Sequence, residues 1–212
     1  MTSTSTICRL GILISGRGSN MLALADAIKE RRISGAELSL VVSDKRDAAG
    51  LALARERGLT ALVIERGGRA RQEHDREMVA ALREHQVDIV CLAGYMRLLS
   101  GYFIDAYRNR ILNIHPSLLP SFPGLNPHKK VLESGVKWTG CTVHFVDETL
   151  DGGPIIAQRA VPVLPGDTEE SLAARILEQE HQLYTEAVEL IMNGKIEVVG
   201  QRVLRKNQTR DD

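Results

Sequence analysis

The sequence predicts a single α/β domain: a Rossmann-like, mostly parallel sheet with helices on both faces and an antiparallel addition in its second half. Two observations predict this fold. Short β-branched runs alternate with segments of helical periodicity through the first half of the chain, as in βαβ units with a parallel sheet. In the second half, two longer strand-like runs flank an Asp-Gly-Gly-Pro segment, which is typical of antiparallel strands. At 212 residues the chain is long enough to bury the core of such a domain.

Five short strands are expected in the first half, each rich in β-branched residues. They are RLGILI (9–14), ELSLVVS (37–43), TALVIE (60–65), VDIVCLAG (87–94) and RILNIHP (110–116). Between them, apolar residues recur at helical spacing from Asn20 to Glu30 and from Arg71 to His85. Both segments should therefore form amphipathic helices.

The second half should contain two antiparallel strands and one long helix. The strands correspond to WTGCTVHFV (138–146) and PIIAQRAVPV (154–163). The helix should run from Thr168 to Asn193, because Thr168 is followed by two glutamates and Gly194 follows the last turn. Threonine and glycine are common at the N-terminal and C-terminal ends of helices, respectively.

Composition limits the classes of function. Lys plus Arg and Asp plus Glu both total 27, so the formal net charge is zero and no global field would attract nucleic acid or an anionic membrane. Cys8, Cys91 and Cys141 are too few and too scattered for a disulfide framework, so we expect buried thiols beside strands. No signal peptide or long apolar run is visible. We expect a cytoplasmic protein, without nucleic acid or membrane as partner, with one domain over residues 1–204 and a polar tail over residues 205–212.

The loop after the first expected strand is a candidate phosphate site. Its sequence SGRGSN (15–20) leads directly from a strand into a helix, which brings backbone N–H groups and a positive helix end to one point. Met21 stands where a dinucleotide motif has its third glycine, and no Gly-Lys-Ser/Thr follows. A phosphate monoester therefore fits better than a dinucleotide or a triphosphate. Gly18, Ser19 and Asn20 are the candidate donors; the alternative is that the glycines only make a tight turn.

Asn113 and His115 are a candidate catalytic pair. They lie two residues apart in an expected strand, so their side chains should extend from the same face, at the sheet edge where ligands bind. The Asn113 amide can donate to a developing oxyanion while His115 moves a proton, which suits acyl-type transfer. Neither is a plausible nucleophile, which favours direct attack by a substrate amine. Taken singly, these two residues and Asp151 also have structural explanations, as a strand end, a loop cap and an Asp-Gly turn.

Longer motifs point to a known family. They are ISGRGSN (14–20), LAGYMRLLS (92–100), ILNIHPSLLPSFPG (111–124), TVHFVDETLDGGPI (142–155) and the run Gln179-Glu180-His181. Through them the chain resembles the phosphoribosylglycinamide formyltransferases (glycinamide ribonucleotide transformylases), folate-dependent enzymes of early purine biosynthesis, along nearly its full length. The NIHPSLLP block alone is shared with other enzymes that use 10-formyltetrahydrofolate, and the phosphate loop narrows the choice.

The resemblance implies a formyltransferase-type fold and roles for matching positions. Gly18, Ser19 and Asn20 would hold the phosphate of glycinamide ribonucleotide, and Glu180 would engage its ribose or amine end. The folate site would be lined by Arg71, Met96, Arg97, Leu98, Leu99 and Asn113.

The resemblance also implies details of the folate site and shows two departures. The pterin would be held by backbone groups around 96–99 and in the 147–151 loop, within a hydrophobic lining, and Leu119-Pro120 would be a cis bond. Asn126 stands where many relatives have a histidine, and Arg17 occupies a variable place in the phosphate loop. These departures concern fine substrate contacts.

The reaction that the resemblance implies is transfer of a formyl group from 10-formyltetrahydrofolate, as co-substrate, to the amine of glycinamide ribonucleotide in de novo purine (IMP) biosynthesis. We expect direct amine attack through a tetrahedral intermediate. Asn113 and His115 would stabilise the oxyanion, with His115 as general acid and Asp151 as its electrostatic and orienting partner.

No metal is expected, because the six histidines lack ligand spacing. The alternatives are a formyl-folate hydrolase, with the same triad directing water, and a nucleotide-binding module without catalysis. We expect a monomer or homodimer.

Overall fold

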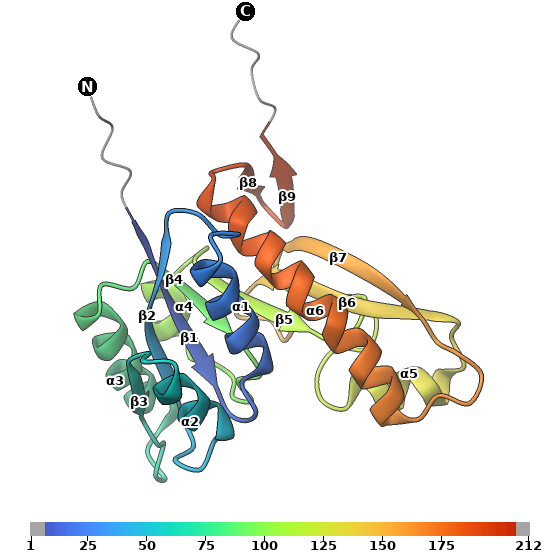
Figure 1. Ribbon diagram of the computed structural model, residues 1–212, viewed down its shortest axis with the longest axis horizontal. Coiled ribbons are helices and arrows are strands. Elements are labelled where there is room, and N and C mark those ends of the chain that lie inside the picture. Colours follow the sequence, from blue (N-terminus) through green and yellow to red (C-terminus); the bar gives the residue numbers. More distant parts are fainter. Residues whose placement is uncertain (1–6, 207–212) are drawn as a thin grey trace, which may run out of the picture.

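The computed structural model describes residues 7–206, which form a nine-stranded sheet with helices on both faces (Figure 1). The strands are β1 (Cys8–Ile14), β2 (Ala36–Ser43), β3 (Ala61–Val63), β4 (Ile89–Leu92), β5 (Ile111–His115), β6 (Trp138–Phe145), β7 (Ile155–Pro162), β8 (Ile196–Val199) and β9 (Arg202–Arg205). Their order across the sheet is β3-β2-β1-β4-β5-β6-β7-β9-β8. The first five strands pair in parallel, β6 is antiparallel to β5, and β7 is antiparallel to β6. The predicted parallel sheet with an antiparallel addition is confirmed.

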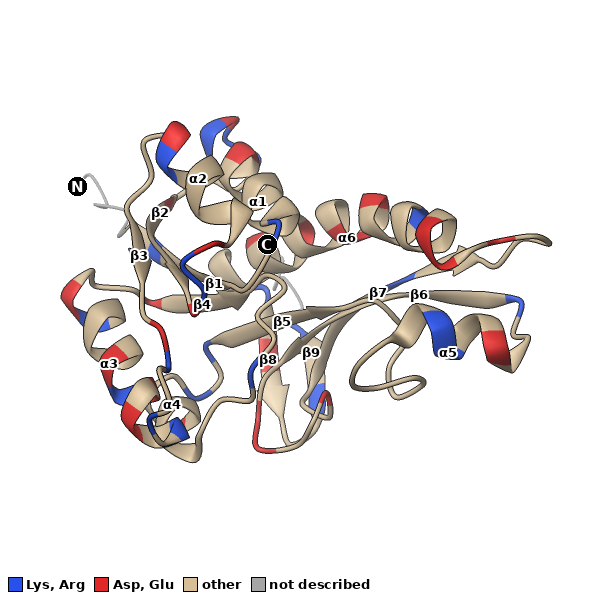
Figure 2. Cartoon of the chain, turned by 90° about the horizontal axis from the view of Figure 1, so that it is seen from below, with Lys and Arg blue, Asp and Glu red and all other residues tan. Residues whose placement is uncertain are grey.

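Helices cover both faces of the sheet. They are α1 (Ser19–Lys29), α2 (Ala49–Glu56), α3 (Arg71–Glu84), α4 (Gly101–Ala106), α5 (Pro127–Ser134) and α6 (Glu169–Met192). Side chains of α1, α2 and α6 belong to one buried apolar cluster and those of α3 and α4 to another. The two groups lie on opposite sides of the sheet in Figure 2, which also shows acidic and basic residues interspersed along the helices. The helices predicted over 20–30 and 71–85 are confirmed as α1 and α3.

The long helix α6 is capped as predicted and is attached to the centre of the sheet. Ser171 N donates to Thr168 Oγ1 at 3.2 Å, and Thr168 N donates to Ser171 Oγ at 3.0 Å, which satisfies N–H groups at the start of the helix. Farther along, the buried Tyr184 hydroxyl lies 3.1 Å from the carbonyl oxygens of Leu92 and Leu112. Leu92 ends β4 and Leu112 lies in β5, so one side chain of α6 contacts two neighbouring central strands.

The C-terminal hairpin of β8 and β9 was not predicted. Its two strands pair antiparallel, and β9 joins the edge of β7. Arg205, where the polar tail was expected to begin, is the last residue of β9. Residues 207–212 of that tail lie outside the described residues.

The three cysteines lie in strands as free thiols: Cys91 and Cys141 are buried and Cys8 is half-buried. Burial raises the pKa of both Cys91 and Cys141 to about 12, so these thiols stay protonated at neutral pH. The expectation of thiols beside strands is confirmed, with Cys8 less covered than expected. Within residues 7–206, no helix combines the length and the apolar character needed to cross a bilayer.

Candidate active site

The loops after β1 and β4 and the end of β5 hold most of the candidate residues, and these three strands are adjacent in the sheet. The others lie elsewhere: Arg71 at the start of α3, Asp151 in the turn before β7 and Glu180 on α6. The strand order reverses between β1 and β4, because β2 and β3 lie on the other side of β1. Open α/β sheets bind ligands at such a reversal.

Asn113 and His115 share one face of β5, as predicted. Leu112 packs in the apolar cluster that includes α1 and α6, whereas Ile111 packs in the cluster that includes α3 and α4. Because side chains alternate along a strand, Asn113 and His115 extend to the side of Ile111. His115 is buried and Asn113 is partly exposed.

Asp151 brings two histidines together. Its Oδ2 lies 3.4 Å from His115 Nδ1, and its Oδ1 lies 3.8 Å from His144 Nε2. The residue sits in the turn before β7 with φ 49°, a left-handed conformation that Asp and Asn tolerate better than most residues. Gly124 N donates to Asp151 Oδ2 at 2.8 Å, so the carboxylate also anchors the loop after β5.

The position of His115 is fixed from both sides of its ring. Its Nε2 lies 3.0 Å from the Phe122 carbonyl oxygen. Since a carbonyl oxygen only accepts, Nε2 must carry a proton in this contact. The other nitrogen, Nδ1, faces the Asp151 carboxylate. His115 therefore stands between a backbone acceptor and a carboxylate, with its ring orientation determined.

His144, on β6, is a site residue that the sequence analysis missed. Its Nδ1 lies 2.8 Å from the Phe145 carbonyl oxygen, and its Nε2 lies 3.1 Å from Asn113 Nδ2. Burial lowers the pKa of His144, against smaller raising effects of the Phe145 carbonyl and Asp151, so the ring is neutral at pH 7. With the proton on Nδ1, Nε2 accepts a hydrogen bond from the Asn113 amide.

The contact with His144 determines which way the Asn113 amide points. An Asn side chain can place either its oxygen or its NH₂ group at a given position. Only the NH₂ group can donate to the lone pair of Nε2. One N–H of Asn113 is therefore used by His144, and the second remains available as a donor. The arrangement of an oriented amide, an imidazole and a carboxylate can stabilise a developing oxyanion and move a proton.

The register of the sheet places His144, and this is why the sequence did not reveal it. Asn113 pairs with His144 across β5 and β6. On its other side, β6 changes register against β7 between Val143 and His144, so counting outward from the hairpin turn would misplace the histidine. The only signal in the sequence is its position in the TVHFV run (142–146).

The predicted phosphate loop has the geometry of an anion site. Gly18 precedes α1 with φ 77°, and a Cβ atom at this position would lie 2.8 Å from the Gly50 Cα, so only glycine fits. Gly50 N also donates to Gly16 O at 2.9 Å. No side chain caps α1 and its first turn contains no acidic residue. The first N–H groups of this helix therefore lack a side-chain partner and can bind an anion.

Glu180 on α6 lies next to this loop. Asn20 Nδ2 donates to Glu180 Oε2 at 2.7 Å, across 160 residues of sequence. Burial raises the pKa of Glu180, while the Asn20 hydrogen bond and the charge of Arg17 oppose that shift. The buried Asn20 Oδ1 has no hydrogen-bond partner among the described residues. This pair therefore presents a carboxylate and a free amide oxygen beside the start of α1.

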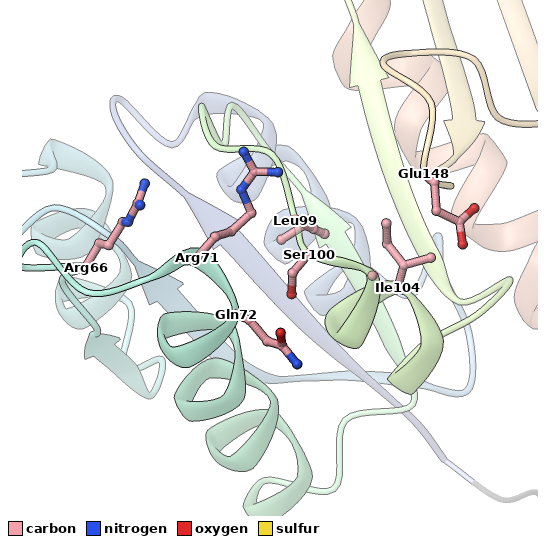
Figure 3. Close-up of a pocket in the computed structure, with 8 residues that line it drawn as sticks. Arg66, Arg71, Gln72, Leu99, Ser100, Ile104 and Glu148 are labelled. Atoms are coloured by element: carbon pink, nitrogen blue, oxygen red, sulfur yellow. The ribbon is translucent and has the colours of Figure 1, made fainter.

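Most of the predicted folate residues line two cavities that share Arg66 and Arg71. The larger, of about 470 Å³, is lined by Arg66, Arg71, Gln72, Leu99, Ser100, Gly101, Ile104 and Glu148 (Figure 3). The smaller, of about 160 Å³, is lined by Arg66, Arg71, His74, Asp75, Arg97 and Leu98. Met96 and Asn113 line neither cavity, and the Met96 side chain is exposed. The lining is more charged than the hydrophobic one that we expected.

Other expectations concern the loop after β5. Leu119-Pro120 is a cis peptide bond, as predicted. Thr142 Oγ1 donates to Ser117 O at 2.7 Å and accepts from Leu119 N at 3.0 Å, so β6 holds this loop in place. Asn126 is exposed and precedes α5 with φ 54°, without a side-chain hydrogen bond to the helix. Over residues 7–206, no group of three or more His, Cys, Asp or Glu side chains is arranged to hold a metal ion.

The family model, the curated relatives and the solved structures that resemble this chain include formyltransferases in each case. Residues 8–188 match the protein family described as formyl transferase. The chain is 44% identical over 188 residues to phosphoribosylglycinamide formyltransferase of Escherichia coli (strain K12), covering 88% of each protein. It is 48% identical over 191 residues to the trifunctional purine biosynthetic protein adenosine-3 of Gallus gallus, and that match covers 90% of this chain but only 19% of the relative. Among solved structures, glycinamide ribonucleotide transformylase 1 from Symbiobacterium toebii superposes with a TM-score of 0.94 at 48% identity, over 97% of both chains.

Proposed function

This chain belongs to the formyl transferase family, and we propose that it transfers a formyl group from 10-formyltetrahydrofolate to the amine of glycinamide ribonucleotide in purine biosynthesis. The observation that carries the proposal is the contact of Asp151 with both His115 and His144 beside the oriented amide of Asn113. Two further features support it: the uncapped start of α1, which suits a phosphate monoester, and the arginine-lined cavities, which suit the carboxylates of a folate.

In the proposed reaction, each residue has a separate task. The free N–H of Asn113 donates to the oxygen of the formyl group as negative charge develops there. His115 supplies a proton to the nitrogen that leaves, and Asp151 orients the ring and balances its charge. The buried thiols stay protonated, so the substrate amine attacks the formyl carbon directly and forms a tetrahedral intermediate. As the bond to the folate nitrogen breaks, the attacking amine gives up one proton, which replaces the proton that His115 has donated.

The proposed substrate contacts follow the positions of the loops. Gly18, Ser19 and Asn20 bind the phosphate through the first turn of α1, and Glu180 binds the ribose or amine end. The folate lies against Arg71, Arg97, Leu98 and Leu99, with backbone groups around 96–99 holding the pterin. The match to the trifunctional relative of Gallus gallus covers only 19% of that protein. We therefore propose only the formyl-transfer step for this chain.

The test is a direct assay of formyl transfer from 10-formyltetrahydrofolate to glycinamide ribonucleotide, followed by absorbance. Turnover that requires both substrates supports the proposal. Rapid formate release without glycinamide ribonucleotide would favour the hydrolase instead. Binding of the nucleotide without any binding of folate in calorimetry would favour a module without catalysis.

Two variants test the chemistry separately from binding. Asn113→Ala and His115→Ala should each lower turnover by about 10²- to 10³-fold, as for loss of one oxyanion donor, while substrate dissociation constants change little. Near wild-type turnover at saturating substrates would remove that residue from the mechanism.

We also propose a cytoplasmic monomer or homodimer, which sedimentation of the purified protein and fractionation of cells would test.

A further inference from the structure

A chain of hydrogen bonds centred on the buried Asp44 side chain joins the loops after β1, β2 and β4, and the proposed chemistry does not use it. Ser15 Oγ donates to Asp44 Oδ1 at 2.6 Å, and Arg97 Nε donates to Asp44 Oδ2 at 2.6 Å. Met96 N donates to Ser15 Oγ at 3.0 Å. The Asp44 side chain is only 2% exposed, whereas that of Arg97 is 37% exposed, so water competes little for the bond between Ser15 and Asp44.

Both oxygens of the Asp44 carboxylate are engaged by donors from different loops. A buried carboxylate is costly unless it is paired and hydrogen-bonded. Losing either donor would leave part of that cost uncompensated. The hydroxyl of Ser15 donates to Asp44 and accepts from Met96, so the bonds polarise one another in one direction. Asp44, from the loop after β2, therefore links the loops after β1 and β4, which also bond to each other directly through Met96 N and Ser15 Oγ.

The two ends of this series of hydrogen bonds lie at the two proposed substrate sites. Ser15 is the first residue of the phosphate loop (15–20), and its own N–H donates to Gly94 O at 3.1 Å. Gly16, the next residue, accepts from Gly50 N, beside the position where Gly18 allows no side chain. At the other end, Arg97 lines the smaller cavity of the proposed folate site.

We propose that Asp44 is a positioning residue that couples the two substrate sites, so that binding of one substrate raises the affinity for the other. A phosphate bound in the loop restricts the motion of Ser15, and through Asp44 that of Arg97 and the backbone of Met96. The second substrate then meets a segment whose motion is already restricted, so its binding costs less conformational entropy. This inference rests on the proposed function, because it takes its two ligands from there.

The test is the thermodynamic coupling between the two ligands, measured by isothermal titration calorimetry on the full chain. The dissociation constant for glycinamide ribonucleotide is measured alone and with saturating tetrahydrofolate, which carries no formyl group and cannot react. We expect tetrahydrofolate to tighten nucleotide binding by at least about 5-fold, the lower end of typical couplings. By reciprocity, the nucleotide must tighten tetrahydrofolate binding by the same factor.

Two variants interrupt this series of hydrogen bonds at different points. Ser15→Ala removes both side-chain bonds of Ser15, to Asp44 and from Met96 N, and keeps the pair of Asp44 and Arg97. Asp44→Ala removes the bonds from Ser15 and Arg97 and keeps the one from Met96 N to Ser15. Each should lower the coupling factor toward 1. The matched control is Asp167→Ala, because Asp167 is also a buried carboxylate, with a side chain 4% exposed, and is paired with Arg175 at 2.8 Å. It lies before α6 and outside the three loops, so its coupling factor should equal that of the wild type.

The outcomes separate the inference from the proposed function. If wild-type protein binds neither ligand, the proposed function falls, and this inference with it. If it binds both ligands with independent affinities, only the inference is overturned. A wild-type coupling factor in Ser15→Ala would also overturn it, even if the affinity for each ligand alone has fallen. A merely structural role would weaken the binding of both ligands without changing the factor by which one ligand tightens the binding of the other. Ser15→Ala decides the matter if Asp44→Ala does not fold.

Discussion

Replacing His144 by Phe tests whether the histidine acts by orienting the Asn113 amide. Phe keeps a ring at this buried position and removes Nε2, which lies 3.1 Å from Asn113 Nδ2. The amide is then free to turn, and its oxygen can occupy the position from which its N–H should donate. The donor itself is still present in the variant, so the effect should be much smaller than that of deleting it.

His144→Phe removes two hydrogen bonds, the one from Asn113 Nδ2 and the one to the Phe145 carbonyl oxygen, and the expected effect on turnover follows from the first of them. A typical intramolecular hydrogen bond contributes about 0.5 to 1.5 kcal/mol, which corresponds to a loss in turnover of about 2- to 13-fold. Deletion of an oxyanion donor lowers turnover by about 10²- to 10³-fold, so the His144→Phe variant should keep a much higher kcat than Asn113→Ala. The assay is kcat for formyl transfer at saturating substrates. His85→Phe is the control, because His85 follows α3 and bonds the carbonyl oxygen of Ala81, away from the site.

A double-mutant cycle gives the decisive result. If His144 acts only through Asn113, adding His144→Phe to Asn113→Ala should cause no further loss of turnover. Losses that multiply in the double variant would refute this reasoning and would assign His144 a contact of its own with the reacting groups.

Four further predictions follow from the geometry. Asp151→Asn keeps a residue that tolerates φ 49°, so the melting temperature should change little while kcat falls; an unchanged pH–rate profile would remove Asp151 from the mechanism. Glu180→Gln should raise KM for glycinamide ribonucleotide with kcat nearly unchanged, and a rise in folate KM alone would contradict its placement. Gly18→Ala forces a Cβ atom to 2.8 Å from the Gly50 Cα, so nucleotide affinity by calorimetry should fall, and retained affinity would argue against a phosphate site there. Because burial lowers the His144 pKa below 6.5, the unfolded chain takes up its proton first, and the free energy of unfolding should fall as pH drops below about 6.5; urea titrations of His144→Phe should show a shallower pH dependence, and an identical one would contradict the argument.

The fold could be predicted because its local signals agree with each other. Strands buried on both faces are nearly continuous in apolar residues, and in β1 the run from Leu10 to Ile14 is buried throughout. Helix ends were also predictable where residue chemistry determines them, as at Thr168. The hairpin of β8 and β9 was missed because each strand has only four residues and much of each is exposed at the sheet edge, where strand propensity depends on context.

The candidate site could be predicted only where its residues are close in sequence. Asn113 and His115 are two positions apart on one strand, so periodicity alone placed them together. His144 depends on pairing between β5 and β6 and on an irregular register beside it, which no local pattern encodes. Arg66 lies on the loop after the edge strand β3 and Asp44 on the loop after its neighbour β2, and no local sequence pattern shows which loops meet.

The attachment of α6 has a consequence for how the protein is made. Asn20, near the start of the chain, meets Glu180 on this helix, and Tyr184 reaches the central strands β4 and β5. The parallel half of the sheet can form during synthesis, yet the substrate site is unfinished until α6 has left the ribosome and docked. A nascent chain should therefore be inactive however much of its sheet has formed, and during refolding the return of turnover should report the arrival of the last long helix.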